Sequence, residues 1–254
     1  MTVQTLNQLH ELRLSGMATA LETQLQQPGT YAELPFLERL GLLVTQEHLQ
    51  RENRKQTRLV RQAGFRLQAT LQEIDYQQHR NLKRAQIAQL SQGEWLTRAQ
   101  NLLITGPCGT GKTYLACALG RHACHQGQSV RYFRTSRLLL ELTQAKADGS
   151  YQKLLTQLAK TQLLILDDWG LEVLKPGQRN DLMEIMDDRS GVTSTVLISQ
   201  LPTEQWYAAI GDNTLADAIL DRLMHNSHRL ELKGESMRKH TGENIEREHL
   251  GDNS

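Results

Sequence analysis

The stretch that decides the fold is Gly106-Pro107-Cys108-Gly109-Thr110-Gly111-Lys112-Thr113, which matches the pattern G-x-x-x-x-G-K-[ST]. Residues 101–105 predict a short buried strand before it, and residues 114–123 predict a helix after it. The glycines let successive backbone N–H groups converge on a phosphate, and the helix N-terminus adds its positive dipole end. Lys112 can then reach the β- and γ-phosphates, while the Thr113 hydroxyl can ligate Mg²⁺. The stretch therefore predicts a site for a nucleoside triphosphate.

The chain around this loop alternates apolar strands with helices. Further strands are expected at 129–133, 163–167, 193–199 and 229–232, with helices between them. Near-continuous apolar strands of this kind predict an α/β fold, in which a parallel sheet is covered by helices on both faces. Ligands of such sheets gather at the C-terminal ends of the strands, where the phosphate-binding loop lies.

Two of these strands end in polar side chains that fit a triphosphate site. Residues 163–168 read LLILDD, so Asp167 is expected to hold Mg²⁺ and Asp168 to orient or deprotonate the attacking water. The strand at 193–199 ends at Ser199 and Gln200, either of which can reach between the γ-phosphate and Asp167. Gln200 is the first choice and Ser199 the second.

Two arginines near the end of the chain are further candidates. Arg222 is expected to end a helix, where it can face the γ-phosphate bound by a neighbouring subunit. The alternative is a salt bridge to Asp221 or Asp217. Arg238 can contact the phosphates of the nucleotide, or it can belong to a tail without that role.

The N-terminal part has a different character. Residues 1–66 predict an all-helical domain, and residues 67–95 a linker with a lead-in helix before a main domain at 96–254. Basic residues recur at steps of three or four along the third expected helix, which places most of them on one face. They are Arg51, Arg54, Lys55, Arg58 and Arg61. This face either binds a polyanion or is solvated or turned toward a partner.

Composition narrows the class of protein. The 254 residues carry a net charge of +1 and are 39% hydrophobic, which is enough for a core, so any nucleic-acid footprint must be local. Neither an apolar run of about 20 residues nor a signal peptide is visible, which predicts a cytoplasmic protein without a membrane anchor. The three cysteines contain no C-x-x-C pair, which fits a reducing compartment.

The ordered set of motifs resembles the AAA+ ATPases, and more narrowly the IstB-type transposition helpers and the related DnaC-type helicase loaders. Beside the phosphate loop, the motifs are LRLSGM at 12–17, LLILDDWG at 163–170, ISQLP at 198–202, DRL at 221–223 and GESMR at 234–238. The resemblance implies an AAA+ ATPase domain at 96–254 that hydrolyses ATP with Mg²⁺ and is stimulated by DNA. It also implies that Gln200 or Ser199 is sensor 1, Arg222 the arginine finger and Arg238 a sensor-2-like arginine.

The same resemblance implies partners. They are double-stranded DNA, the transposase of the same element, and further copies of the chain in an ATP-dependent oligomer. The alternative is a DnaC-like loader that engages a replicative helicase through residues 1–66. Initiator-like relatives approach DNA after the second strand, where this chain has Arg134, Arg137, Lys146 and Lys153. About 22 residues follow residue 232, too few for the several packed helices of a typical AAA+ lid, so we expect no full C-terminal lid.

Overall fold

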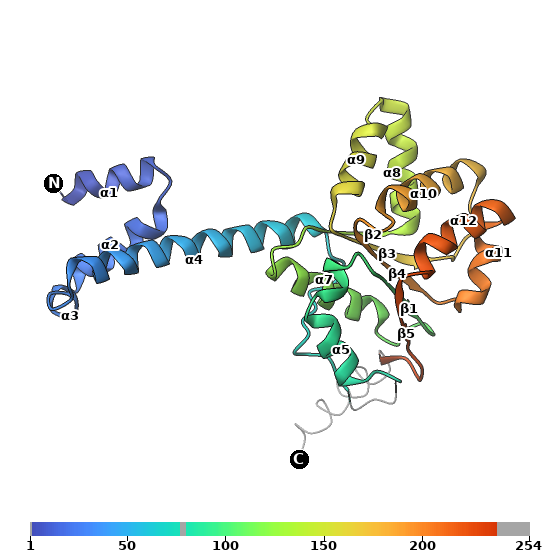
Figure 1. Ribbon diagram of the computed structural model, residues 1–254, viewed down its shortest axis with the longest axis horizontal. Coiled ribbons are helices and arrows are strands. Elements are labelled where there is room, and N and C mark those ends of the chain that lie inside the picture. The colour runs from blue at the N-terminus through green and yellow to red at the C-terminus, as the bar shows by residue number, and fades with distance from the viewer. Residues whose placement is uncertain (1, 77–79, 238–254) are drawn as a thin grey trace, which may run out of the picture. The chain divides into compact units, whose positions relative to one another are not determined.

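The computed structural model describes residues 2–76 and 80–237 (Figure 1). The chain divides into two compact units, Met1–Arg58 and Leu59–Ser254. The boundary between them falls within one helix, α4 (Phe36–Ala63). The division of the chain at residues 66 and 95 stays a prediction.

The first unit is helical. It contains α1 (Thr2–Glu11), α2 (Ser15–Gln26), α3 (Pro28–Tyr31) and most of α4. α2 and α4 approach each other closely where the backbone of Gly16 lies against Glu47. A Cβ at position 16 would stand 2.6 Å from the Cα of Glu47, so only glycine allows this approach.

Glu47 holds the start of α2. Its carboxylate accepts hydrogen bonds from the backbone N–H groups of Gly16 (2.7 Å) and Met17 (3.2 Å), and from Nε of Arg51 (2.6 Å). A carboxylate near a helix N-terminus also interacts favourably with the helix dipole. The hydrogen bond from Arg51 is the main reason why the pKa of Glu47 lies below its usual value of 4.5.

This lowered pKa predicts that acid loosens the first unit. The contribution of Glu47 to stability is fully present above pH 4.5, its usual pKa, and is lost as the pH falls through the lowered folded value. The Glu47→Gln variant should lack the pH dependence of stability that the carboxylate causes. At neutral pH its helicity should already be as low as that of the wild type in acid. Circular dichroism of both chains between pH 3 and 7 measures this. Identical pH profiles would contradict the role of Glu47.

The second unit is built on a five-stranded parallel sheet in the order β2-β3-β4-β1-β5. Its strands are β1 (Asn101–Thr105), β2 (Val130–Arg134), β3 (Leu163–Trp169), β4 (Ser194–Ser199) and β5 (Ser227–Glu231). Its helices are α5 (Arg84–Ser91), α6 (Glu94–Thr97), α7 (Lys112–His125), α8 (Thr135–Asp148), α9 (Tyr151–Lys160), α10 (Pro176–Arg189), η1 (Thr203–Gln205), α11 (Trp206–Ile210) and α12 (Asn213–Met224). The fold is thus the predicted α/β fold.

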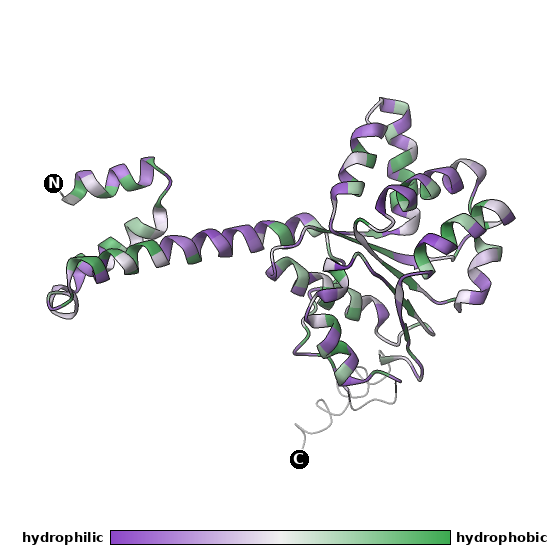
Figure 2. Ribbon diagram, in the orientation of Figure 1, coloured by the Kyte–Doolittle hydropathy of each residue, from purple (hydrophilic) through white to green (hydrophobic). Residues whose placement is uncertain are grey.

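Alternate side chains of each strand build two separate cores. Leu102 and Ile104 pack with α5 and α7 on one face of the sheet, whereas Leu103 packs with α8, α10 and α12 on the other. β3 divides in the same way, with Ile165 on the first face and Leu164 on the second. Because both faces are covered, the strands are apolar along most of their length, as Figure 2 shows.

The segment between β4 and α12, which received no assignment from the sequence, forms η1 and α11. Trp206, fully buried at the start of α11, packs edge-on against Trp169 with 5.9 Å between the ring centroids. Tertiary packing around one large side chain therefore orders a segment too short to form a stable helix alone. Within the described residues, every helix is too short or too polar to cross a membrane.

Arg189 lies inside the second unit and is 2% exposed. It donates to the backbone oxygens of Leu158, Thr161 (2.7 Å) and Ser194 (2.5 Å), and to Oγ1 of Thr195 (3.1 Å). These bonds connect the end of α10 to the end of α9 and the start of β4. Burial lowers the pKa of Arg189 to about 9, so the guanidinium is still charged near neutral pH.

Candidate functional site

The phosphate-binding loop runs from the end of β1 to the start of α7, as predicted. Gly106 has φ 142°, and a Cβ there would overlap the carbonyl oxygen of Leu232. Gly111, the residue before α7, has φ 89°, which side-chain-bearing residues rarely adopt. The Thr110 hydroxyl donates to the oxygen of Pro107 (3.0 Å) and closes the turn, while Cys108 is exposed on it.

Lys112 is the first residue of α7, and its side chain folds back over the loop. Its Nζ donates to the carbonyl oxygens of Gly106 (2.6 Å) and Pro107 (2.7 Å). Burial lowers the pKa of Lys112, while the nearby Asp167 and Asp168 act in the opposite direction. A partly desolvated ammonium among backbone N–H groups is well suited to bind a multiply charged phosphate.

Asp167 lies at the centre of the site and is 1% exposed. Its Oδ2 accepts hydrogen bonds from the hydroxyls of Thr113 (2.8 Å) and Tyr132 (2.6 Å), and its Oδ1 from the N–H of Asp168 (2.8 Å). Burial and the bond to Asp167 raise the pKa of Tyr132, which therefore stays a donor. The Thr113 hydroxyl and the Asp167 carboxylate are hard oxygen ligands held together, a donor set that fits Mg²⁺.

Asp168 has an unusual backbone conformation and one firm ion pair. Its φ of 60° is rare for a residue other than glycine. Its Oδ2 accepts from Nε of Arg134, 2.8 Å away at the end of β2. This pair also holds the pKa of Arg134 above its usual value. Arg134 was expected to contact DNA, and in the structure its guanidinium lies beside the nucleotide site.

The two candidates at the end of β4 differ in their surroundings. Ser199 is buried, and its hydroxyl donates to the oxygen of Trp169 (2.7 Å) and accepts from the N–H of Leu201 (3.1 Å). Gln200 is exposed and has no hydrogen-bond partner within the described residues. It lines a cavity of about 210 Å³ together with Lys112, Thr113 and Asp167. Gln200 is thus the side chain available to a ligand there.

Arg222 forms a salt bridge with a different aspartate from those that the sequence suggested. Its Nη2 lies 2.7 Å from Oδ1 of Asp187 on α10, and its Nη1 donates to the oxygen of Ala218 (3.0 Å). The considered salt bridge to Asp221 or Asp217 is not the one observed, because Asp187 approaches from the neighbouring helix. Arg238 lies outside the described residues.

The sequence did not indicate a role for Arg80, a buried residue that contacts the phosphate-binding loop. It is 7% exposed, and its Nη1 donates to the oxygen of Thr110 (3.2 Å). It also lies so close to Gly111 that a Cβ at that position would stand 2.8 Å from Nη1. Nothing in the sequence around position 80 indicates this role, since Arg80 is distant from the motif along the chain.

The expected DNA-binding side chains fall into two groups. Five of them are exposed on α4, where Arg51 pairs with Glu47 and Arg54 donates to Oγ of Ser15 (2.6 Å). The other group is on the second unit, where Arg137 and Lys153 are exposed on α8 and α9. Lys146 differs, because its ammonium lies 2.5 Å from Oδ1 of the buried Asp181.

The sheet order, the phosphate loop and the adjoining acidic strand end together define an ATPase fold of the AAA+ type. Solved structures share this architecture. AMPPCP-bound DnaA from Aquifex aeolicus matches with a TM-score of 0.57 and 18% identity over 72% of this chain and 56% of its own. A DnaC helicase loader matches with a TM-score of 0.51 and 22% identity over 59% of this chain and 87% of its own. At this identity the likeness concerns the fold.

The family follows from the sequence matches. The model of the IstB-like ATP binding proteins matches residues 7–244. An insertion sequence ATP-binding protein of Sinorhizobium fredii is 47% identical over 235 residues, which cover 92% of this chain and 96% of the relative. The ATP-binding protein of insertion sequence IS1162 from Pseudomonas fluorescens is 50% identical over 204 residues, covering 80% and 88%. The chain therefore belongs to the IstB-like family.

Proposed function

We propose that this chain is an ATP-dependent, DNA-binding helper of transposition. In this proposal it assembles on target DNA in the ATP-bound state and recruits or activates the transposase of its element, and ATP hydrolysis controls the assembly. Family membership and relatives named after insertion sequences support the association with transposition. The observation that carries the proposal is the contact between Thr113 and Asp167 beside Lys112, which matches what a metal-bound triphosphate requires.

The residues of the site have distinct roles in this proposal. The N–H groups of the loop and Lys112 bind the phosphates, and Thr113 with Asp167 would hold Mg²⁺, which supplies charge neutralisation when it is bound. Asp168 orients or deprotonates the attacking water. Gln200 carries the state of the γ-phosphate to the end of β4, while Ser199 fixes that strand end against β3.

The ion pair between Arg134 and Asp168 bears on the timing of hydrolysis. While Arg134 donates to the Asp168 carboxylate, the Oδ2 oxygen is occupied and does not accept from the attacking water. Both oxygens of Asp168 face the water once Arg134 has turned away. Arg134 is exposed enough to reach a phosphate of DNA, so DNA binding can release Asp168 for catalysis.

Two surfaces support assembly on DNA. The exposed basic side chains of α4, with Arg137 and Lys153 on the second unit, offer positive charge to phosphates without reading the sequence of the bases. Arg222 is about 29% exposed near the end of α12 and can exchange Asp187 for the γ-phosphate of a neighbouring subunit. ATP then favours association, because each site is completed by the next copy.

A helicase loader is the second candidate function, favoured by the fold shared with a DnaC helicase loader. The same ATPase unit serves either role. Purified transposase of the element and purified replicative helicase, each offered to the immobilised chain with ATP, separate the two. Retention of the helicase alone favours the loader.

DNA binding with a non-hydrolysable ATP analogue tests the proposal directly. Fluorescence anisotropy of labelled double-stranded DNA should show binding that depends on the analogue. If about five phosphates are neutralised, the slope of log K against log salt should be about −4.5. Replacing Lys55 and Arg58 together by alanine should reduce this slope by about 2, since each charge removed releases about one counterion fewer.

The matched control is Arg98→Ala, which removes an exposed basic side chain just after α6 with only a weak pair, 3.5 Å from Glu94. It should leave the slope unchanged. Arg222→Ala should bind the analogue normally and fail to assemble on DNA in sedimentation. DNA binding that depends neither on the nucleotide nor on the salt concentration would contradict the proposed function.

A further inference from the structure

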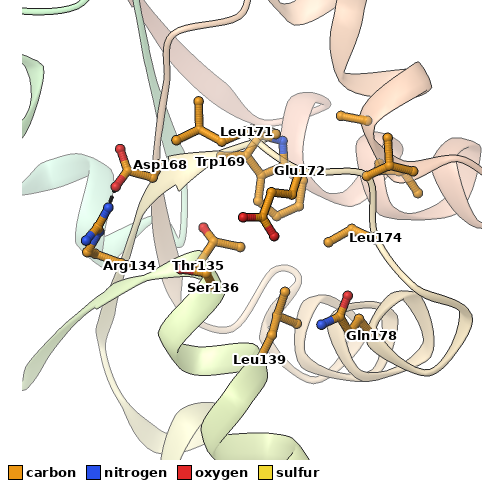
Figure 3. A pocket seen from close by; sticks show the side chains of 14 residues that line it. Arg134, Thr135, Ser136, Leu139, Asp168, Trp169, Leu171, Glu172, Leu174 and Gln178 are labelled. Carbon is orange, nitrogen blue, oxygen red and sulfur yellow. Dashed lines mark hydrogen bonds and ion pairs between the residues drawn. The ribbon is translucent and has the colours of Figure 1, made fainter.

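A second cavity, of about 160 Å³, shares Asp168 with the nucleotide site (Figure 3). It lies between the start of α8, the segment 169–174 that follows β3, and the end of α11. None of the nucleotide-binding roles proposed above uses it. An apolar cavity of about 150 Å³ can bind a molecule as large as benzene, so this one has room for one branched or aromatic side chain.

One part of the cavity wall is apolar. Leu139, Leu174 and Ile210 line it, each buried in the core on that face of the sheet. Leu171 and Val173 also line it and are 49% and 67% exposed. Exposed apolar side chains beside polar ones around a cavity are typical of a surface that binds another protein.

Trp169 forms a buried aromatic part of the wall. Its side chain is 2% exposed, and its Nε1 is buried without an acceptor within the described part of the chain. The face that lines the cavity is therefore the apolar ring and not the N–H group. An aliphatic or aromatic side chain of a peptide packs well against such a ring.

Glu172 adds a charge at the same cavity. Its side chain is exposed and turned toward the cavity among the labelled residues of Figure 3, and no ion-pair partner for it exists within the described residues. The other charges that line the cavity, Arg134 and Asp168, neutralise each other at 2.8 Å. The remaining charge is negative and complements a lysine or arginine.

We infer that this cavity docks a short segment of the transposase, in which an apolar side chain stands next to a lysine or arginine. The apolar side chain fills the space beside Leu139 and the ring of Trp169, and the basic side chain pairs with Glu172. The inference rests on the proposed function, because that function names the partner. It assigns to the segment 169–174 a role separate from the nucleotide site.

Overlapping peptides that tile the transposase of the same insertion sequence serve as probes. Each is labelled and titrated with the full chain, and binding is measured by fluorescence anisotropy. At least one peptide with an apolar residue beside a lysine or arginine should bind. Glu172→Gln should weaken it about threefold and Glu172→Lys tenfold or more, since an exposed pair contributes little and a like charge repels. Ala209→Met, which extends a side chain from α11 into the cavity, should reduce binding by more than about tenfold.

The matched control is Glu141→Gln on α8, an exposed glutamate that does not line this cavity and should leave binding unchanged. The variants of Glu172 should fold because this side chain lies on the surface. They therefore still test the inference if Ala209→Met does not fold. The inference is overturned if no peptide binds the wild type, or if Glu172→Lys and Ala209→Met bind equally well. It is also overturned if these variants abolish association between copies of the chain while no peptide binds.

Nucleotide binding and DNA binding are measured on the same protein preparations. These measurements show whether the docking site or the proposed function is wrong. Loss of peptide binding with intact nucleotide-dependent DNA binding overturns the docking site alone. Peptide binding that persists in a chain without nucleotide-dependent DNA binding supports the docking site and contradicts the proposed function.

Discussion

Lys112→Ala is expected to weaken ATP binding by about 100-fold or more. The ammonium of Lys112 lies on the phosphate loop, where it donates to the carbonyl oxygens of Gly106 and Pro107, and from this position the side chain can turn to the β- and γ-phosphates. Two hydrogen bonds to charged groups are worth roughly 3 kcal/mol or more, which corresponds to a factor of about 100 in affinity. Isothermal titration with ATP and Mg²⁺ measures the loss.

Lys160→Ala is the matched control, because it removes an exposed lysine at the end of α9, far from the loop in sequence. Its affinity for ATP should equal that of the wild type. Thermal unfolding of both variants shows whether the loop change is local. An affinity of Lys112→Ala within about threefold of the wild type would exclude the proposed role, since no hydrogen bond to a phosphate is worth so little.

Arg189→Met should destabilise the second unit by roughly 3 kcal/mol or more. Methionine fills a similar apolar volume, but it removes a donor from the buried oxygens of Leu158, Thr161 and Ser194, of which Leu158 keeps the N–H of Thr161. Each buried acceptor left unpaired costs about 1–3 kcal/mol. For a unit of this size, about 3 kcal/mol corresponds to a fall in Tm of roughly 6–12 °C, which calorimetry or circular dichroism can measure.

Arg98→Met removes an arginine of the same size from the surface of the same unit, and its Tm should change by less than about 2 °C. Equal Tm values for Arg189→Met and the wild type would mean that the free-energy cost of desolvating the guanidinium equals the stabilisation from its hydrogen bonds. That outcome would mean that Arg189 does not stabilise the start of β4 at Ser194.

The sequence predicted the parts of the fold whose physics is local. The strand at Asn101–Thr105 and the acidic strand end at Asp167 are visible because strands buried on both faces must be apolar throughout. The loop between Gly106 and Thr113 is visible because its glycines and lysine stand at fixed spacing. These features brought Thr113 and Asp167 together in the expected way, at 2.8 Å.

The parts that escaped prediction depend on contacts between distant segments. Arg134 was expected to contact DNA, and its ion pair with Asp168 was missed because the pairing of β2 with β3 cannot be deduced from its own neighbours. Arg80 has no local signal for its bond to Thr110. The same holds for the partner of Arg222, since the packing of α10 on α12 decides which aspartate it meets.

The acidic side chains of α10 have a consequence for how force travels through the second unit. Asp181 binds Lys146 of α8 and accepts from the hydroxyl of Tyr151 of α9 (2.8 Å), while Asp187, near the other end of the helix, binds Arg222 of α12. The three helices α8, α9 and α12 are therefore all bound by side chains of one helix, α10. A displacement of α10 along its axis would therefore strain all of these contacts together, including the ion pair of Arg222.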